Sequence, residues 1–144
     1  MGSGLLVAAG SLGLTVALLH AVIAFSPAMC RYFGAPESFV ARGPVVVAVV
    51  TLFLAAMFAT WGLYAFSGAG WLPRLPLLAP GLAGISVIFT ARGLVLFFQL
   101  LVRAGVVRWR APVSRRDVVS SAVSLLIGIA YLAGTVASWL ALGG

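Results

Sequence analysis

Four long apolar runs dominate the chain, and short segments with proline, glycine and arginine separate them. A helix needs about 20 apolar residues to cross a hydrocarbon core of about 30 Å. The runs lack the alternation of polar and apolar residues that marks transmembrane strands. We therefore predict an all-α membrane protein, a four-helix bundle with spans over residues 5–25, 45–66, 81–102 and 118–142. Residues 1–144 are expected to form a single integral membrane domain.

The composition supports this class. Apolar residues make up 63% of the chain and charged residues only 8%, whereas soluble domains are roughly 45–50% apolar and about 25% charged. A disordered chain would need low hydrophobicity and high charge. The first run follows no basic segment, unlike a secretory signal peptide, so we expect it to be a retained helix.

The arginines predict the orientation, because loops rich in basic residues stay in the cytoplasm. Arginines concentrate in loops 26–44 and 103–117, whereas the loop between the second and third spans has only Arg74. We expect both of these arginine-rich loops to be cytoplasmic, both termini to face outward, and the protein to lie in a bacterial inner membrane. An aromatic belt near the outer surface is then expected from Trp61, Tyr64, Trp71 and Trp139.

Small and polar residues recur at helical spacing and predict the packed faces. They form one stripe on each of three spans: Gly10, Gly13, Ala17, His20 and Ala24 on the first; Ala48, Ala55, Ala59 and Gly62 on the second; and Asp117, Ser121, Ser124, Gly128, Tyr131, Thr135 and Ser138 on the fourth.

Arg92 lies near the middle of the third span. An arginine at a helix centre costs about 2.5–3.5 kcal/mol on insertion scales, and such residues usually face the protein interior or a water-filled cavity. Gln99 and Arg103 share its helix face. His20, Thr51 and Ser124 lie about 8–9 Å from the inner end of their spans. We expect an intramembrane pocket open to the cytoplasm, with binding candidates Arg92, His20, Gln99, Ser124, Tyr131 and Thr51.

Three kinds of partner remain open for Arg92. The chain has two acids, Glu37 and Asp117, and either is a possible ion-pair partner. The alternatives are hydroxyls, carbonyls and water, or a bound anion such as a lipid phosphate or a small metabolite. The acids also have local interpretations. Pro36 suits the start of a short helix with Glu37 near its positive end, and Ser114 with Asp117 matches a helix-capping pattern.

His20 most simply hydrogen-bonds to a Ser or Thr of the fourth span, although a proton-relay role is open because histidine side chains in general change charge near neutral pH. Met29 and Cys30 lie on the same side, so a soft His, Met and Cys set for haem or copper is a further alternative. No ligand spacing supports that set, and we predict no cofactor and no metal.

The residue types exclude the common enzyme templates, since one histidine and two acids outside the spans provide no paired-carboxylate or H-E-x-x-H arrangement. We expect a non-enzymatic accessory or assembly protein that recognises a lipid or anion and docks on another membrane protein or on itself. An oligomeric transporter or channel for a small anionic solute is the first alternative, and a haem or redox subunit the second. The net charge of +7 indicates contact with anionic headgroups rather than nucleic acid. The arginines expected to make that contact are Arg108, Arg110, Arg115 and Arg116.

Overall fold

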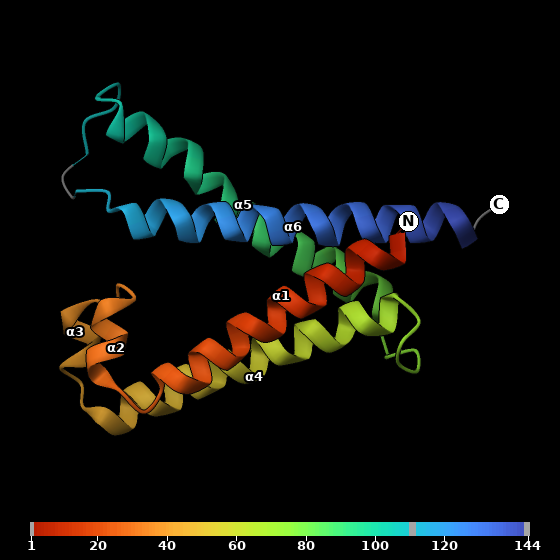
Figure 1. The fold of residues 1–144 in the computed structure, drawn as a ribbon, viewed down its shortest axis with the longest axis horizontal. Helices are drawn as coiled ribbons and strands as arrows, with labels where there is room; N and C mark the ends of the chain where they lie inside the picture. The colour runs from red at the N-terminus through yellow and green to blue at the C-terminus, as the bar shows by residue number, and fades with distance from the viewer. Residues whose placement is uncertain (1, 110–111, 143–144) are drawn as a thin grey trace.

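A computed structural model describes residues 2–109 and 112–142 of the chain. Its helices are α1 (Gly2–Ile23), α2 (Pro27–Tyr32), α3 (Glu37–Val40), α4 (Pro44–Gly68), α5 (Leu78–Arg103) and α6 (Arg115–Leu142). The helices α1, α4, α5 and α6 are long and apolar enough to cross a membrane. The prediction of a four-helix membrane bundle is therefore confirmed. Both ends of the chain lie at one end of the bundle, and α2 and α3 lie at the other (Figure 1).

All four long helices begin before their predicted first residues, and local chemistry in the first turn accounts for the early start of two of them. Helix α5 begins at Leu78 rather than at residue 81, and it includes Pro80 because a proline in the first turn has no amide hydrogen to leave unpaired. Helix α6 begins at Arg115 rather than at residue 118. The Ser114 amide donates to Asp117 at 2.8 Å and the Asp117 amide donates to the Ser114 hydroxyl at 3.2 Å, so the reciprocal cap adds a turn.

The segment between α1 and α4 folds back as two short helices, of which the second, after Pro36, was predicted and the first was not. The Ser26 hydroxyl caps α2, and α3 follows Pro36 with Glu37 in its first turn. Arg31 of α2 donates to Glu37 of α3 through two nitrogens, at 2.9 and 3.0 Å. Glu37 therefore pairs with Arg31 and not with Arg92.

We expect acidification to loosen this elbow of α2 and α3. Hydrogen bonds from Arg31 lower the pKa of the Glu37 carboxyl below its ordinary value. A carboxyl whose pKa is lowered by folding contributes fully to stability above its ordinary pKa, about 4.3. That contribution is lost as the pH falls through the lower pKa of the folded protein. A spin label at Ser38 (Ser38→Cys with Cys30→Ser) should gain mobility below about pH 4.

The matched variant for that experiment is Glu37→Gln, which removes the charge and leaves the size. Its label should be mobile at neutral pH and insensitive to acid. Equal mobility of both proteins over the whole pH range would show that the ion pair does not hold the elbow.

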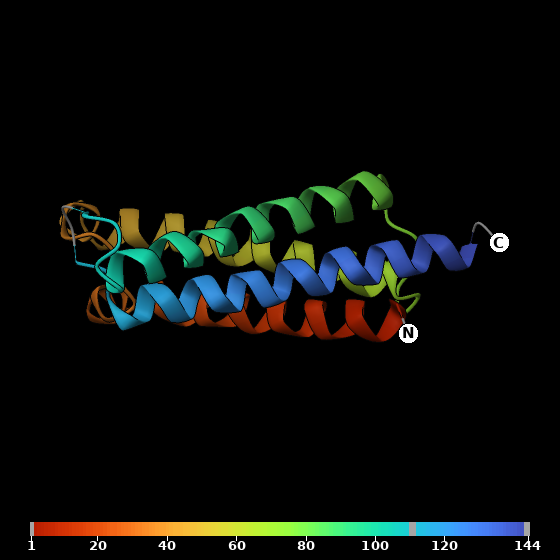
Figure 2. The same cartoon turned by 90° about the horizontal axis from the view of Figure 1, so that it is seen from above.

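The four long helices run lengthwise (Figure 2) and associate as two pairs, α1 with α4 and α5 with α6. Glycines permit the close approach. A Cβ on Gly10 of α1 would lie 3.1 Å from the Gly62 carbonyl of α4. A Cβ on Gly93 of α5 would lie 2.5 Å from the Leu125 backbone nitrogen, and one on Gly128 of α6 would lie 2.5 Å from the Thr90 hydroxyl. Three of these four glycines belong to the predicted small-residue stripes.

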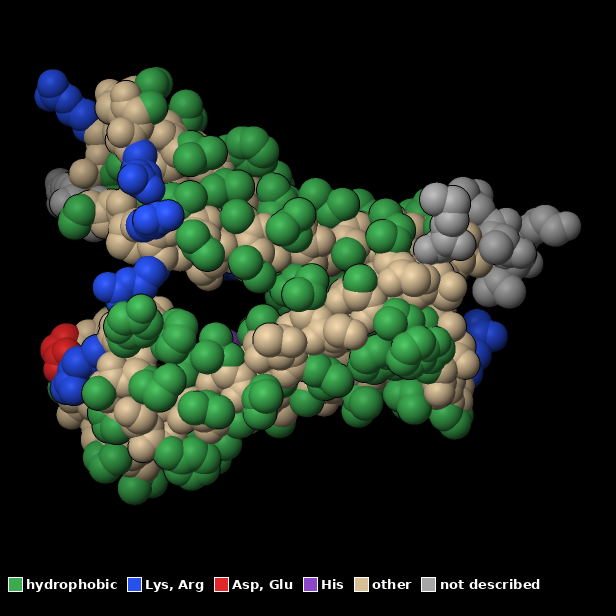
Figure 3. All heavy atoms as spheres, viewed as in Figure 1, with side chains coloured by type: hydrophobic (Ala, Val, Ile, Leu, Met, Phe, Trp, Pro, Cys, Tyr) green, Lys and Arg blue, Asp and Glu red, His purple; other side chains and the backbone are tan. Residues whose placement is uncertain are grey.

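The two pairs share one core only at the end that carries the termini. Residues of all four long helices form that core: Leu6, Ala9, Ala65, Leu82, Ile85, Phe89, Ile127 and Tyr131. A second core belongs to the α1–α4 pair and the elbow, with Ile23, Cys30, Val40 and Val47. The pairs therefore diverge toward α2 and α3 (Figure 1). We call the space between them the notch; Figure 3 shows it hollowed between two lobes, with the background visible through it.

Candidate functional site

An aromatic cluster closes the inner end of the notch. Phe58 and Trp61 of α4 pack against Phe89 of α5, with ring centroids 6.0 and 5.4 Å away. Phe89 stacks on Tyr131 of α6 at 6.0 Å, and the Tyr131 hydroxyl donates to the Trp61 carbonyl at 2.8 Å. The structure thus places Tyr131, a predicted binding candidate, in the wall that joins the two pairs. It also turns Trp61 inward, away from the aromatic belt expected of it.

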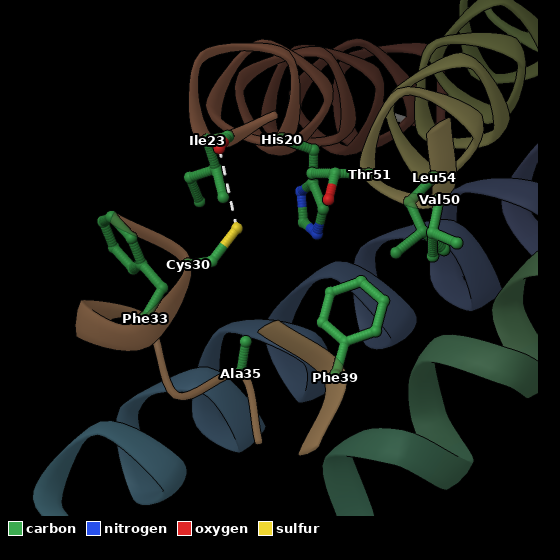
Figure 4. Close-up of a pocket in the computed structure, with 9 residues that line it drawn as sticks. All are labelled: His20, Ile23, Cys30, Phe33, Ala35, Phe39, Val50, Thr51 and Leu54. Carbon is green, nitrogen blue, oxygen red and sulfur yellow. Dashed lines mark hydrogen bonds between the residues drawn. The ribbon is translucent and has the colours of Figure 1, made fainter. Parts of the chain in front are cut away.

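A pocket of about 150 Å³ lies on the α1–α4 side, beneath the elbow. Nine residues line it: His20, Ile23, Cys30, Phe33, Ala35, Phe39, Val50, Thr51 and Leu54. Figure 4 shows the His20 ring pointing from α1 into this pocket, with the Phe39 ring below it. Two predicted candidates, His20 and Thr51, are therefore brought together.

The hydrogen bonds within the pocket leave one imidazole nitrogen for a ligand. His20 Nδ1 lies 2.8 Å from the Val16 carbonyl, and since a carbonyl only accepts, Nδ1 carries a proton. The expected Ser or Thr partner on α6 is thus replaced by a carbonyl of α1 itself. The Thr51 hydroxyl donates to Val47 at 2.7 Å and the Cys30 thiol to Ile23 at 3.6 Å. Among the described residues, Nε2 of His20 has no such bond, and the ring points into the pocket toward Phe39 (Figure 4).

Arg92 belongs to the opposite side of the notch. Its Nη1 donates to the Ser121 hydroxyl of α6 at 2.7 Å, and its Nη2 lies 3.5 Å from the Ser120 hydroxyl. The Asp117 carboxylate interacts with Arg92 and Arg116 through Coulombic attraction. Within residues 2–109 and 112–142, however, Arg92 forms no ion pair at contact distance, whereas Arg31 pairs with Glu37. Hydroxyl groups are therefore its direct partners.

The side chain of Arg92 extends toward the end of the bundle that carries the elbow. Its Cα lies eleven residues before Arg103, or about 16 Å from that end of α5 at 1.5 Å per residue. Ser121 lies six residues after the start of α6, only about 9 Å from the same end. The guanidinium is thus carried several ångströms toward the membrane boundary, as arginines in spans commonly are.

Ser120 and Ser124 lie on the face of α6 that points toward the α1–α4 pair. They precede Tyr131 by eleven and seven residues, about three and two helical turns, and Tyr131 contacts α4. The Ser124 hydroxyl donates to the Ser120 carbonyl at 2.9 Å. Ser120 and Arg92 are exposed although they lie between the two pairs, which is the result expected when both border the notch.

Arg116 of α6 contacts the other lobe at the mouth of the notch. Its guanidinium carbon lies 4.9 Å from the ring centroid of Tyr32, on α2. A cation over an aromatic face is attracted by the ring quadrupole. This contact spans the opening, and Figure 3 shows basic side chains on both lobes there.

Two further predicted residues of α5, Gln99 and Arg103, differ in their burial. Gln99 is buried, and its Oε1 has no hydrogen-bond partner among the residues that the structure describes, whereas Arg103 is exposed at the end of α5. The expected polar ribbon of α5 is therefore interrupted by a buried amide. Arg110, one of the expected headgroup contacts, lies outside the described residues.

Sequence reasoning did not find the residues that shape the notch. Phe39 and Leu54 of the pocket and the Phe58–Trp61–Phe89 cluster were indistinguishable from ordinary residues that fill spans. The sequence feature that could have indicated this cluster is the spacing of Phe58 and Trp61, which places both side chains on one helix face. Cys30 lines the pocket together with His20, but no group of three metal-ligating side chains occurs in the described part of the chain.

No family model, curated protein or solved structure matches the chain. Its class therefore follows from the fold and the site alone. The protein is a multi-pass α-helical membrane protein of four spans. Its helix pairs join at one end and diverge at the other around an arginine and a histidine.

Proposed function

We propose that this protein is a non-enzymatic accessory protein of a bacterial inner membrane that recognises an anionic group through Arg92. The observation that supports this proposal is the environment of the Arg92 guanidinium. It borders the notch, serine hydroxyls orient it, and no carboxylate of the described residues contacts it. A guanidinium has five donors and binds phosphate or carboxylate through two of them at once. Donors of Arg92 remain available for that purpose.

The orientation is part of the proposal. Loops 26–44 and 103–117 are cytoplasmic, since the positive-inside rule applies to their arginines, and the notch opens on that side. The exposed residues Arg108, Arg115 and Arg116 contact anionic headgroups, each contributing about 1 kcal/mol. Because the loops are short, a protein partner meets this chain within or beside the bilayer.

The test is the phosphorus content of protein purified from membranes, compared between wild type, Arg92→Gln and Arg74→Gln. Losing a hydrogen bond to a charged group costs about 1.5–3 kcal/mol, or roughly tenfold or more in affinity. We therefore expect Arg92→Gln to retain less phosphorus per chain. Arg74→Gln, which removes an exposed arginine at the end of the bundle opposite the elbow, should retain the wild-type amount. Equal phosphorus in wild type and Arg92→Gln would refute recognition of phosphate by Arg92.

An oligomeric carrier for a small anionic solute is the second candidate. The observation that favours it is the arrangement of the notch, which the aromatic cluster closes at its inner end, whereas at its mouth the contact between Arg116 and Tyr32 spans the opening. Flux of phosphate into liposomes that depends on Arg92 would favour this candidate over an accessory role.

A further inference from the structure

We infer that the occupant of the notch is an anionic glycerophospholipid of the surrounding bilayer, with its phosphate at Arg92 and an acyl chain along the His20 pocket. This inference rests on the proposed function and names the ligand. It requires three properties of the notch: access from the bilayer, an apolar wall, and a cation at the depth of a lipid phosphate.

Access follows from the shape. The two helix pairs diverge, and the background is visible between the lobes (Figure 3), so the notch opens sideways. The side chains next to this opening on α4 include Val50, which is 39% exposed and lines the pocket. A lipid enters such an opening without leaving the bilayer, whereas a soluble anion must first cross the headgroups.

The apolar wall has room for part of an acyl chain. The pocket has a volume of about 150 Å³, and an apolar cavity of about that volume accommodates a six-carbon ring. Two of its polar groups, the Thr51 hydroxyl and the Cys30 thiol, are bonded to backbone carbonyls. Burying apolar surface there contributes about 25 cal/mol per Å², which favours a chain over water.

The cation lies at a suitable depth. Helix α6 spans about 37 Å between Arg115 and Trp139, which exceeds the hydrocarbon core of about 30 Å by several ångströms at each end. The guanidinium of Arg92, held at the level of Ser120 and Ser121, is therefore about 5 Å inside the hydrocarbon boundary. A phosphate drawn slightly inward reaches it.

Charge also favours an anionic lipid. Hydrogen bonds from Ser114 and the charges of Arg92 and Arg116 lower the pKa of the Asp117 carboxyl, so this acid is shared between two cations. The described arginines at this end of the bundle, Arg31, Arg42, Arg103, Arg108, Arg115 and Arg116, outnumber the two acids of the chain. A lipid with a net negative headgroup is attracted to this end, whereas a zwitterionic lipid gains less.

The experiment measures retention of phosphatidylglycerol by native mass spectrometry of the full chain, with phosphatidylcholine as the zwitterionic comparison. Two variants alter the two halves of the site separately. Arg92→Gln removes the cation, and Val50→Phe fills the pocket without changing any charge. Val49→Phe is the matched control, because Val49 is 62% exposed on the same helix and does not line the pocket.

We expect wild type and Val49→Phe to retain phosphatidylglycerol in preference to phosphatidylcholine. Arg92→Gln and Val50→Phe should each retain at least about tenfold less phosphatidylglycerol than wild type. Thermal unfolding of each variant without lipid verifies that it is folded.

Two results separate the possible failures. If inorganic phosphate protects wild type but not Arg92→Gln against thermal unfolding, and Arg92→Gln retains phosphatidylglycerol as wild type does, then the lipid is the wrong occupant while Arg92 still recognises an anion. If Arg92→Gln retains phosphatidylglycerol as wild type does and phosphate has no effect, both the inference and the proposed function are wrong. A lipid-free dimer would show that a second copy of the chain occupies the notch, and it would refute the lipid as the occupant.

Discussion

Gly93→Ala should destabilise the protein by about 3 kcal/mol, the upper part of the range for overpacking a close contact. The added methyl group would lie 2.5 Å from the Leu125 backbone nitrogen and 2.6 Å from its Cβ. Backbone cannot rotate aside as a flexible side chain does, so α5 and α6 must move apart. The free energy of unfolding in mixed detergent micelles, measured from the loss of helical circular dichroism, checks this.

Gly84→Ala is the control for that substitution. Gly84 is also in α5, and a Cβ there would meet nothing within 4 Å. Alanine is favoured over glycine in a helix by about 1 kcal/mol, so this variant should be at least as stable as wild type. If Gly93→Ala were as stable as Gly84→Ala, that result would show that α5 and α6 do not approach closely at Gly93.

Phe89→Ala should cost about 3–5 kcal/mol, the range for removing a buried aromatic side chain. Phe89 is 6% exposed and contacts Phe58, Trp61 and Tyr131, so it links α4, α5 and α6. Its removal leaves a cavity where the two helix pairs join. We expect lower stability and a wider separation between the pairs.

The separation can be measured between spin labels at Leu63 of α4 and Ile129 of α6, both exposed. Phe89→Ala should broaden and lengthen that distance. Phe97→Ala is the matched control, since Phe97 is on the same helix but 57% exposed, and it should leave both distance and stability near wild type. An unchanged distance in Phe89→Ala would show that the aromatic cluster does not join the pairs.

Local rules predicted much of what the structure contains. The Ser114–Asp117 cap and the short helix at Pro36 were both predictable, because each depends on residues only a few positions apart. The stripe on α6 was predictable for the same reason, and Ser121, Tyr131 and Thr135 of that stripe are buried.

The candidate site was predicted less completely. His20 and Thr51 share a pocket, as their common depth indicated, but Arg92 lies across the notch from it. Depth along a span gives one coordinate of a side chain, and two side chains at similar depth can still be on different helix pairs. The rotamer of Arg92, which brings its guanidinium to Ser121, is also set by its neighbours on α6.

Sequence alone therefore determined the number of spans, their approximate limits, the cap of α6 and the small-residue faces of α1, α4 and α6. These properties depend on the match between apolar length and bilayer thickness and on contacts between nearby residues. Only the tertiary structure decided that α1 pairs with α4 and α5 with α6, that the pairs diverge around a notch, and that Arg92 binds serines. Lipid provides no hydrophobic drive for helices to associate, so these features arise from steric fit and hydrogen bonds between residues far apart in the chain.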